Sequence, residues 1–272
     1  MNTVHTNVHT GQTRHGQRTY TLEGGCNFRD LGGYSTLSGK TVRWGKIFRT
    51  GVLTYLTDAD HALVGPLDIR AICDLRRAEE RHREPTQWRS SVRQLSWDDG
   101  AAPPTIRALA TKHPNTAAGM RSAMIDLYRV LPSWMAPRLR GMFDSIDTDE
   151  MPLIVHCAAG KDRTGIAIGL LLAMLGVSRD TIVEDYLLTN QTDFQMFIRS
   201  KQHAQLGLAA NAHPLLELPD DVRKVLFAAD ADYLLATFEQ LDKDFGGAKN
   251  FLETHVGVTA AQQKRIADRL LA

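Results

Sequence analysis

The chain has 272 residues, a formal net charge of +1 and a hydrophobic content of 43%. This length suits one large α/β domain or two small ones, and no long linker rich in Pro, Gly or Ser divides the chain. The balanced charge gives no argument for nucleic acid as a partner or for a general attraction to membranes. We therefore expect a domain with a sizeable hydrophobic core and no nucleic-acid partner.

The first 18 residues are polar and lack the apolar core of a signal peptide, so we expect a disordered tail (1–18) before a single domain (19–272). The cysteines, Cys26, Cys73 and Cys157, are too few and too scattered for a disulfide framework. They favour a reducing, cytoplasmic compartment. Secretion by a route without a signal peptide is the alternative.

Alternating strand and helix patterns predict an α/β sheet with helices on both faces. The predicted strands are 19–22, 46–49, 69–73, 92–95 and 153–156. One helix is predicted to begin at Thr57. Further helices are predicted over 116–146 with breaks at Pro132 and Pro137, and over 166–175, 178–189, 220–245 and 260–271. The strand 69–73 is nearly all apolar, which is typical of a buried parallel strand. The apolar stretch 166–177 is too short to span a bilayer.

Local signals predict where several helices begin and end. Thr57, with Asp60 three residues later, has the spacing of a capping box. Ser178 and Thr259 are predicted N-caps of later helices. Gly176 is expected to end the helix that follows the last strand.

The strongest chemical signal is the stretch 156–165 (HCAAGKDRTG), which follows an apolar strand and precedes a helix-forming run. It places Cys157 six positions before Arg163 in a small loop. The N–H groups of such a loop can turn inward around an anion, and the helix adds its positive end. A thiol held there is ionised near neutral pH. Arg163 offers a planar fork to two phosphate oxygens, and the Thr164 hydroxyl can hydrogen-bond the thiolate.

This stretch resembles the H-C-x5-R-[ST]-G signature of the Cys-dependent protein tyrosine phosphatase superfamily, and HCxxGKDRTG looks most like its bacterial PtpB-like branch. Other segments that resemble the family are 25–34 (GCNFRDLGGY), 46–51 (KIFRTG), 72–76 (ICDLR) and 233–247. Thr50, Arg77 and Phe245 stand where the family usually has Ser, Ser and Tyr. The resemblance covers roughly 20–272 and implies the phosphatase fold, a central, mostly parallel sheet flanked by helices, with a helical lid.

The resemblance implies two-step hydrolysis of phosphate monoesters through a phosphocysteine on Cys157, without a metal or other cofactor. Phosphotyrosine proteins or phosphoinositides are the implied substrates, and phosphate or another oxyanion is expected in the loop. The predicted substrate-binding residues are Ala158, Ala159, Gly160, Lys161, Asp162, Arg163 and Thr164. The short side chains of Ala158 and Ala159 favour a deep cleft that an aryl phosphate can enter. We expect the charge of Lys161 to serve a secondary phosphoinositide activity.

The residue that protonates the leaving oxygen is open among three carboxylates. The family resemblance favours Asp162, which lies inside the loop. Asp99 follows a predicted strand in a degraded W-P-D pattern, and Asp74 ends the strand that we expect beside the catalytic one.

Two other functions are compatible with this pattern. The first is a phosphoinositide or inositol phosphate phosphatase that uses the same chemistry. The second is a phosphate-binding pseudoenzyme, or a sulfur or arsenate enzyme that shares C-x5-R. The intact set of Cys157, Arg163 and Thr164 argues against a pseudoenzyme, and the remote positions of Cys26 and Cys73 argue against arsenate reduction.

Three regions carry further expectations. The charged stretch 76–84 (RRAEERHRE) is predicted to be a solvated face that pairs with itself, with a rim for anionic substrates as the alternative. By resemblance, 191–219 forms a mobile lid, with packing against the domain as the alternative. Cys73 is a candidate redox partner of Cys157. That idea fails if Asp74 faces the active site, because neighbouring strand residues point to opposite faces.

Overall fold

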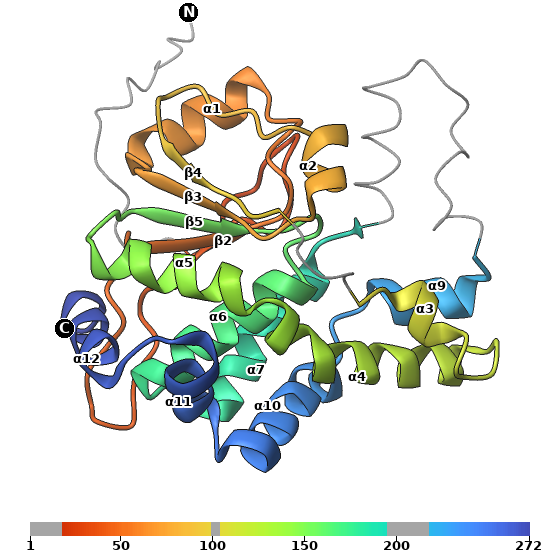
Figure 1. Cartoon of the computed structure of the whole chain (residues 1–272). Coiled ribbons are helices and arrows are strands. Elements are labelled where there is room, and N and C mark those ends of the chain that lie inside the picture. Colours follow the sequence, from red (N-terminus) through yellow and green to blue (C-terminus); the bar gives the residue numbers. More distant parts are fainter. Residues whose placement is uncertain (1–17, 99–103, 195–217) are drawn as a thin grey trace, which may run out of the picture.

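The computed structural model describes residues 18–98, 104–194 and 218–272. Within these ranges the chain folds around a five-stranded sheet of order β1-β2-β5-β3-β4 (Figure 1). The strands are β1 (Arg29–Asp30), β2 (Ile47–Thr50), β3 (Ala71–Asp74), β4 (Arg93–Leu95) and β5 (Leu153–His156). Only the pairing of β1 with β2 is antiparallel among these strands. The predicted α/β fold with a mostly parallel sheet is confirmed.

One face of the sheet packs against α1 (Asp58–Val64), and the short α2 (Ala78–Arg83) lies near the end of β3. The remaining helices lie on the side of the other face. They are α3 (Ile106–Ala110), α4 (Ala117–Trp134), α5 (Ala136–Asp147), α6 (Asp162–Leu175), α7 (Arg179–Leu187), α9 (Asp220–Phe227), α10 (Ala231–Phe245), α11 (Ala248–Phe251) and α12 (Ala260–Leu270). Of these, α5 and α6 lie against the sheet. Helices therefore cover both faces, as the alternating pattern predicts.

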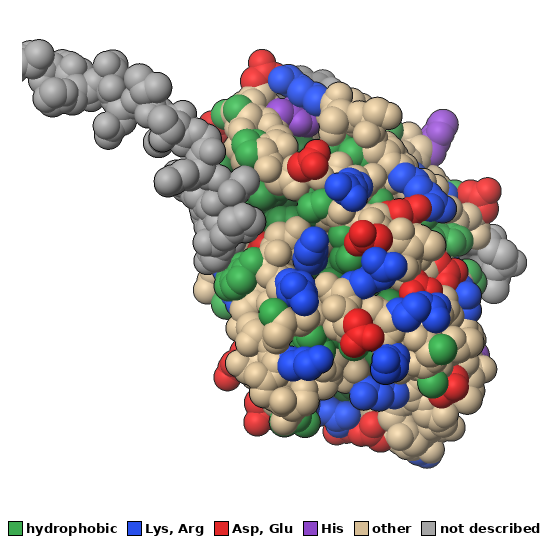
Figure 2. All heavy atoms as spheres, turned by 90° about the vertical axis from the view of Figure 1, so that its left-hand side faces the viewer, with side chains coloured by type: hydrophobic (Ala, Val, Ile, Leu, Met, Phe, Trp, Pro, Cys, Tyr) green, Lys and Arg blue, Asp and Glu red, His purple; other side chains and the backbone are tan. Residues whose placement is uncertain are grey.

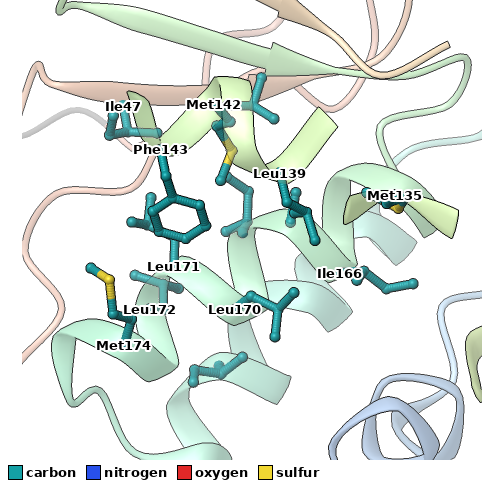
Figure 3. Close-up of a cluster of buried hydrophobic side chains, with 14 of the residues drawn as sticks. Ile47, Met135, Leu139, Met142, Phe143, Ile166, Leu170, Leu171, Leu172 and Met174 are labelled. Atoms are coloured by element: carbon teal, nitrogen blue, oxygen red, sulfur yellow. The ribbon is translucent and has the colours of Figure 1, made fainter. Parts of the chain in front are cut away.

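The larger hydrophobic core lies between the sheet, α5 and α6 (Figure 3). Phe143 of α5 and Leu170 of α6 are fully buried there, and Ile47 reaches the same core from β2. A smaller core on the opposite face joins Phe48 and Ile154 to α1. Since α6 is apolar almost all round and buried along most of its length, its position relative to the sheet is firmly set.

The predicted helix caps are confirmed. Thr57 and Asp60 form both bonds of a capping box, and the side chains of Ser178 and Thr259 cap α7 and α12. Gly176 ends α6 with φ of 85°, a left-handed conformation that suits glycine.

The prediction of a helix break at Pro132 is wrong, because this proline lies inside α4. Proline leaves the carbonyl of the residue four positions earlier without its helical donor. That carbonyl, on Tyr128, instead accepts a hydrogen bond of 2.8 Å from the hydroxyl of Thr237. The chain breaks only at Met135, and Pro137 then occupies the first turn of α5.

Two other boundaries differ from the prediction. The segment 220–245 is not one helix: α9 ends at Phe227, and Asp230 caps a separate helix, α10. The predicted strand 19–22 is reduced to one bridge between Thr19 and Arg29, while the two-residue β1 was not predicted.

Charges of both signs mix with apolar groups on the face seen in Figure 2, as the net charge of +1 leads one to expect. In the described ranges no helix combines the length and apolar character that a membrane crossing needs. The predicted tail up to residue 17, Asp99 and most of the predicted lid (195–217 of 191–219) lie outside the described residues.

Candidate active site

The loop 157–161 joins β5 to α6 at the carboxyl end of the parallel strands. At this edge Thr50, His156 and Asp74 lie side by side on β2, β5 and β3. The first turn of α6 closes with a hydrogen bond of 2.7 Å from the Gly165 N–H to the Lys161 carbonyl. Both ends of the loop are therefore anchored in the core, and the positive end of the α6 dipole faces it.

Consecutive carbonyls of the loop point outward to partners beneath it. The Val52 N–H donates to the Ala158 carbonyl at 3.0 Å, and Cys26 Sγ lies 4.0 Å from the Ala159 carbonyl. In a planar trans peptide the N–H points opposite to the C=O. The N–H groups of the residues that follow these carbonyls, Ala159 and Gly160, consequently point into the loop.

The Gly160 carbonyl is held most firmly, by two side chains. Arg49 Nη2 and Asn27 Nδ2 each donate to it at 2.8 Å, so the Lys161 N–H also turns inward. Gly160 has φ of 67°, and a Cβ there would lie 2.4 Å from the Thr50 carbonyl oxygen. Only glycine fits this position. The loop therefore presents a set of backbone donors to an anion, as the sequence predicts.

Cys157 lies at the base of this cradle with 2% of its surface exposed. The Thr164 hydroxyl is fully buried and has no hydrogen-bond partner among the described residues. A buried hydroxyl is costly unless it is paired. A thiolate on Cys157 or a bound oxyanion is the partner that this position suits.

The guanidinium of Arg163 is held by Glu80 of α2. The prediction that 76–84 is a solvated, self-paired face is therefore confirmed only in part: Arg77 pairs with Glu79 and Glu80 within the stretch, but Glu80 also binds Arg163. Arg163 Nη1 and Nη2 donate to the two Glu80 oxygens at 2.6 and 2.8 Å. Burial raises the pKa of Glu80, but the charge and hydrogen bonds of Arg163 outweigh it and lower the pKa to about 2. This end-on pair leaves Nε–H and one further hydrogen on each terminal nitrogen of Arg163 for phosphate oxygens.

Asp162 follows the loop lysine and lines the same cleft as Cys157. Its Oδ1 accepts a hydrogen bond of 2.7 Å from the Tyr128 hydroxyl and lies 3.4 Å from Lys161 Nζ. Burial raises the pKa of Tyr128 well above its ordinary value, so this hydroxyl remains a donor. The carboxyl group of Asp162 is thus oriented at the mouth of the loop, with 28% of the side chain exposed.

The structure places Asp74 in a different environment. Three hydrogen bonds of 2.6 to 3.1 Å connect its carboxylate to the Arg76 guanidinium, and it does not line the cleft. Burial favours the protonated form, but the neighbouring charges, that of Arg76 among them, lower the pKa of Asp74. Asp74 is therefore not a proton donor at neutral pH. The third candidate, Asp99, lies outside the described residues.

Lys161 does not extend toward solvent. Its ammonium group donates to the carbonyls of Leu226 and Ala228 at 2.5 and 3.0 Å, and the residue is 3% exposed. These carbonyls lie at the C-terminal end of α9, where a cation is stabilising. Lys161 thus connects the loop to α9. The sequence-based expectation that its charge serves a phosphoinositide activity stays a prediction.

A cleft of about 320 Å³ opens above Cys157. Its polar lining comes from the loop, Arg163 and Glu80. The apolar wall of the cleft is formed by side chains from α3, α4 and α9: Ile106, Leu127, Leu131, Trp134, Leu226 and Phe227. The arrangement fits a phosphate ester whose leaving group is apolar and large enough to fill this space.

All three cysteines are free and buried. Cys73 packs in the larger core together with Cys157, whereas Asp74 turns to the opposite face of β3. Burial raises the pKa of the Cys73 thiol, which disfavours the thiolate that disulfide exchange needs. A disulfide between Cys73 and Cys157 remains a prediction. Between Cys26 and Cys73, it is the sulfur of Cys26 that contacts the loop backbone, at the Ala159 carbonyl.

Sequence reasoning missed the side chains that support the loop from below. The segments 25–34 and 46–51 resemble family motifs, but nothing in them indicated that Asn27 and Arg49 bind the loop. Arg49 also pairs with Asp185 of α7, at 2.6 Å. Asp185 carries no signal in the sequence, since its role depends on how α7 packs.

Comparison with known proteins agrees with this geometry. Residues 20–272 match the model of the tyrosine phosphatase family. The chain is 31% identical to a Cupriavidus necator protein whose name assigns it to the tyrosine-protein phosphatases, over 87% of this chain and 83% of that protein. It is 30% identical to the triple specificity protein phosphatase PtpB of Mycobacterium tuberculosis, over 92% and 98% of the two chains. A tyrosine-protein phosphatase of Nostoc commune is 29% identical, over 82% and 73%.

The family match spans nearly the whole described structure and includes the loop, the arginine and the segments that support them. The chain belongs to the tyrosine phosphatase family and is a PtpB-like member of it.

Proposed function

We propose that the protein hydrolyses phosphate monoesters through a phosphocysteine on Cys157, with phosphotyrosine as its preferred substrate. The observation that carries this proposal is that Cys157 precedes three inward-turned N–H groups of the loop and lines the same cleft as Arg163. These donors match the equatorial oxygens of a phosphoryl group under in-line attack.

In the first step the Cys157 thiolate attacks phosphorus, an S–P bond forms and the bond to the leaving oxygen breaks. Asp162 acts as the general acid in this step and gives a proton to that oxygen. In the second step water attacks phosphorus and gives a proton to the Asp162 carboxylate. The S–P bond then breaks, and inorganic phosphate leaves with the thiolate restored.

The apolar wall of the cleft supports an aryl phosphate as substrate. With its phosphate in the loop, phosphotyrosine would place its ring against Leu131 or Trp134 of this wall. The short side chain of phosphoserine would leave the same wall uncovered. A phosphoinositide is the second candidate, favoured by the breadth of substrates that the name of the PtpB relative states.

The buried free thiols support the predicted cytoplasmic compartment.

The role of Lys161 can be tested separately from that of the apolar wall of the cleft. If it acts by holding α9, Lys161→Ala should lower kcat/KM for a phosphotyrosine peptide and a phosphoinositide by the same factor. Wild-type protein should prefer phosphotyrosine over phosphoserine peptides. Measuring kcat/KM on the three substrates at matched pH tests both statements. A loss confined to the lipid would mean that Lys161 contacts the lipid headgroup directly.

The nucleophile and the arginine are tested by one substitution each. Cys157→Ser should abolish turnover, because a serine hydroxyl is not ionised there, yet it should still bind phosphate. Arg163→Lys should lose most activity, since a point charge cannot replace the planar fork. Steady-state hydrolysis of p-nitrophenyl phosphate measures both. Activity of Cys157→Ser within about tenfold of wild type, a factor far below the value of covalent catalysis, would contradict the mechanism.

The proton donor is identified by the leaving group. Asp162→Asn should lower kcat/KM by about 10²–10⁴ for an alkyl or phosphotyrosine ester, the usual contribution of such a residue. The loss should shrink for an activated aryl phosphate, whose leaving oxygen needs little protonation. Asp99→Asn is the matched comparison. If Asp162→Asn lost activity uniformly and Asp99→Asn in a leaving-group-dependent way, the role would belong to Asp99.

The contacts of Glu80 with Arg163 and with Arg77 predict a pH dependence of stability. The pKa of Glu80 is lowered from 4.5 to about 2 in the folded state. Its contribution to the free energy of unfolding, about 3 kcal/mol by linkage, is therefore complete above pH 4.5 and disappears as the pH falls toward 2. Urea unfolding of wild type and Glu80→Gln at several pH values should show this convergence. Glu79→Gln, on an exposed neighbour, is the control, and a difference independent of pH would contradict the pairing.

A further inference from the structure

We propose that Asp185, in α7, is a positioning residue of the phosphate loop that orients the Gly160–Lys161 peptide through Arg49 and Arg29. This inference rests on the proposed binding of phosphate by the loop, and it adds a residue that does not line the cleft.

Asp185 is the centre of a buried cluster, with 1% of its side chain exposed. Its Oδ2 accepts from Arg49 Nη1 at 2.6 Å. Its Oδ1 accepts from Arg29 Nε at 3.0 Å and from the Tyr34 hydroxyl at 2.9 Å. Arg29 Nη2 also donates to the Asp185 backbone carbonyl at 2.7 Å. One carboxylate thus joins two guanidinium groups that come from β1 and β2.

The electrostatics of the cluster depend on this carboxylate. Arg29 and Arg49 are 2% and 1% exposed, and both would be buried like charges without a partner if Asp185 were neutral. Burial and the Arg49 charge already lower the pKa of Arg29 to about 10. Burial opposes ionisation of Asp185, yet the two arginines hold its pKa well below the ordinary range.

The same two arginines control both donors to the Gly160 carbonyl. Arg49 binds Asp185 with one terminal nitrogen and the Gly160 carbonyl with the other. Asn27 donates its amide to that carbonyl, while its own side-chain oxygen accepts from Arg29 Nη1. Among the described residues, both side chains that donate to this carbonyl therefore lead back to Asp185, Arg49 directly and Asn27 through Arg29.

The orientation of this peptide decides the charge that the loop presents. With the Gly160 carbonyl held outward, the Lys161 N–H points at the site of the phosphate. If the carbonyl were released, the peptide could turn and present its oxygen to the phosphate, so that one donor is lost and one repulsive dipole is gained. Loss of a single oxyanion donor costs about 10²–10³ in rate in other enzymes.

The test uses two isosteric variants and one control. Asp185→Asn removes the central charge, and Asn27→Asp removes the amide donor to Gly160 while it keeps an acceptor for Arg29. The control, Asp242→Asn in α10, breaks an exposed ion pair with Arg179. Arg179 lies on α7, the helix that carries Asp185, and the pair touches no part of the loop. For each folded variant, inorganic phosphate binding is measured by the rise in melting temperature with phosphate concentration, and kcat/KM is measured separately.

We expect Asp185→Asn and Asn27→Asp to raise the Kd for phosphate by about tenfold or more and to lower kcat/KM by about 10²-fold, in line with the loss of one oxyanion donor. Asp242→Asn should stay within about twofold of wild type, as a surface ion pair allows. If both loop-directed variants are folded and bind phosphate as Asp242→Asn does, the inference is wrong. Should Asp185→Asn not fold, Arg49→Lys takes its place, because it removes the fork that joins Asp185 to the Gly160 carbonyl. Wild-type protein that binds phosphate but does not turn over would refute the proposed function and leave this test intact.

Discussion

The outward direction of three loop carbonyls is the constraint on which the candidate site depends. A free loop would point its carbonyls and N–H groups in many directions, but here Val52, Cys26, Asn27 and Arg49 engage the carbonyls of residues 158–160 from below. The N–H groups must then face the opposite side. The anion site is thus made by the residues beneath the loop as much as by the loop itself.

Buried charges hold this arrangement in place, each with a defined partner. Glu80 fixes the plane of Arg163, Asp185 fixes Arg49, and the ammonium of Lys161 binds the carbonyls at the end of α9. Compared with apolar side chains of similar volume, such pairs add little net stability, because desolvation offsets their attraction. Their value lies in geometry: each allows one arrangement of the charged group, and that arrangement is preserved before the substrate arrives.

The sequence predicted the elements whose signals are local. The C-x5-R loop, the strand before it, the buried helix after it and the caps at Thr57 and Ser178 depend on nearby residues, and the structure has them. Contacts between distant segments were not predictable in this way. Glu80 looked like one member of a charged surface stretch, and Asp185 like an ordinary helix residue, because their partners lie 83 and 136 positions away in the chain. The prediction at Pro132 was wrong for the same reason. The carbonyl that this proline leaves without a helical donor, on Tyr128, accepts a hydrogen bond from Thr237 of α10.

The central claim is that this loop turns Cys157 into the nucleophile of a phosphate ester hydrolase. Trapping the intermediate tests it most directly: wild-type protein is mixed with an aryl phosphate, quenched with acid within the first turnovers, digested and examined by mass spectrometry. The account predicts the added mass of one phosphoryl group on the peptide that contains Cys157, and none in the Cys157→Ser variant. A phosphoryl group on another residue, or turnover with no labelled cysteine, would contradict it.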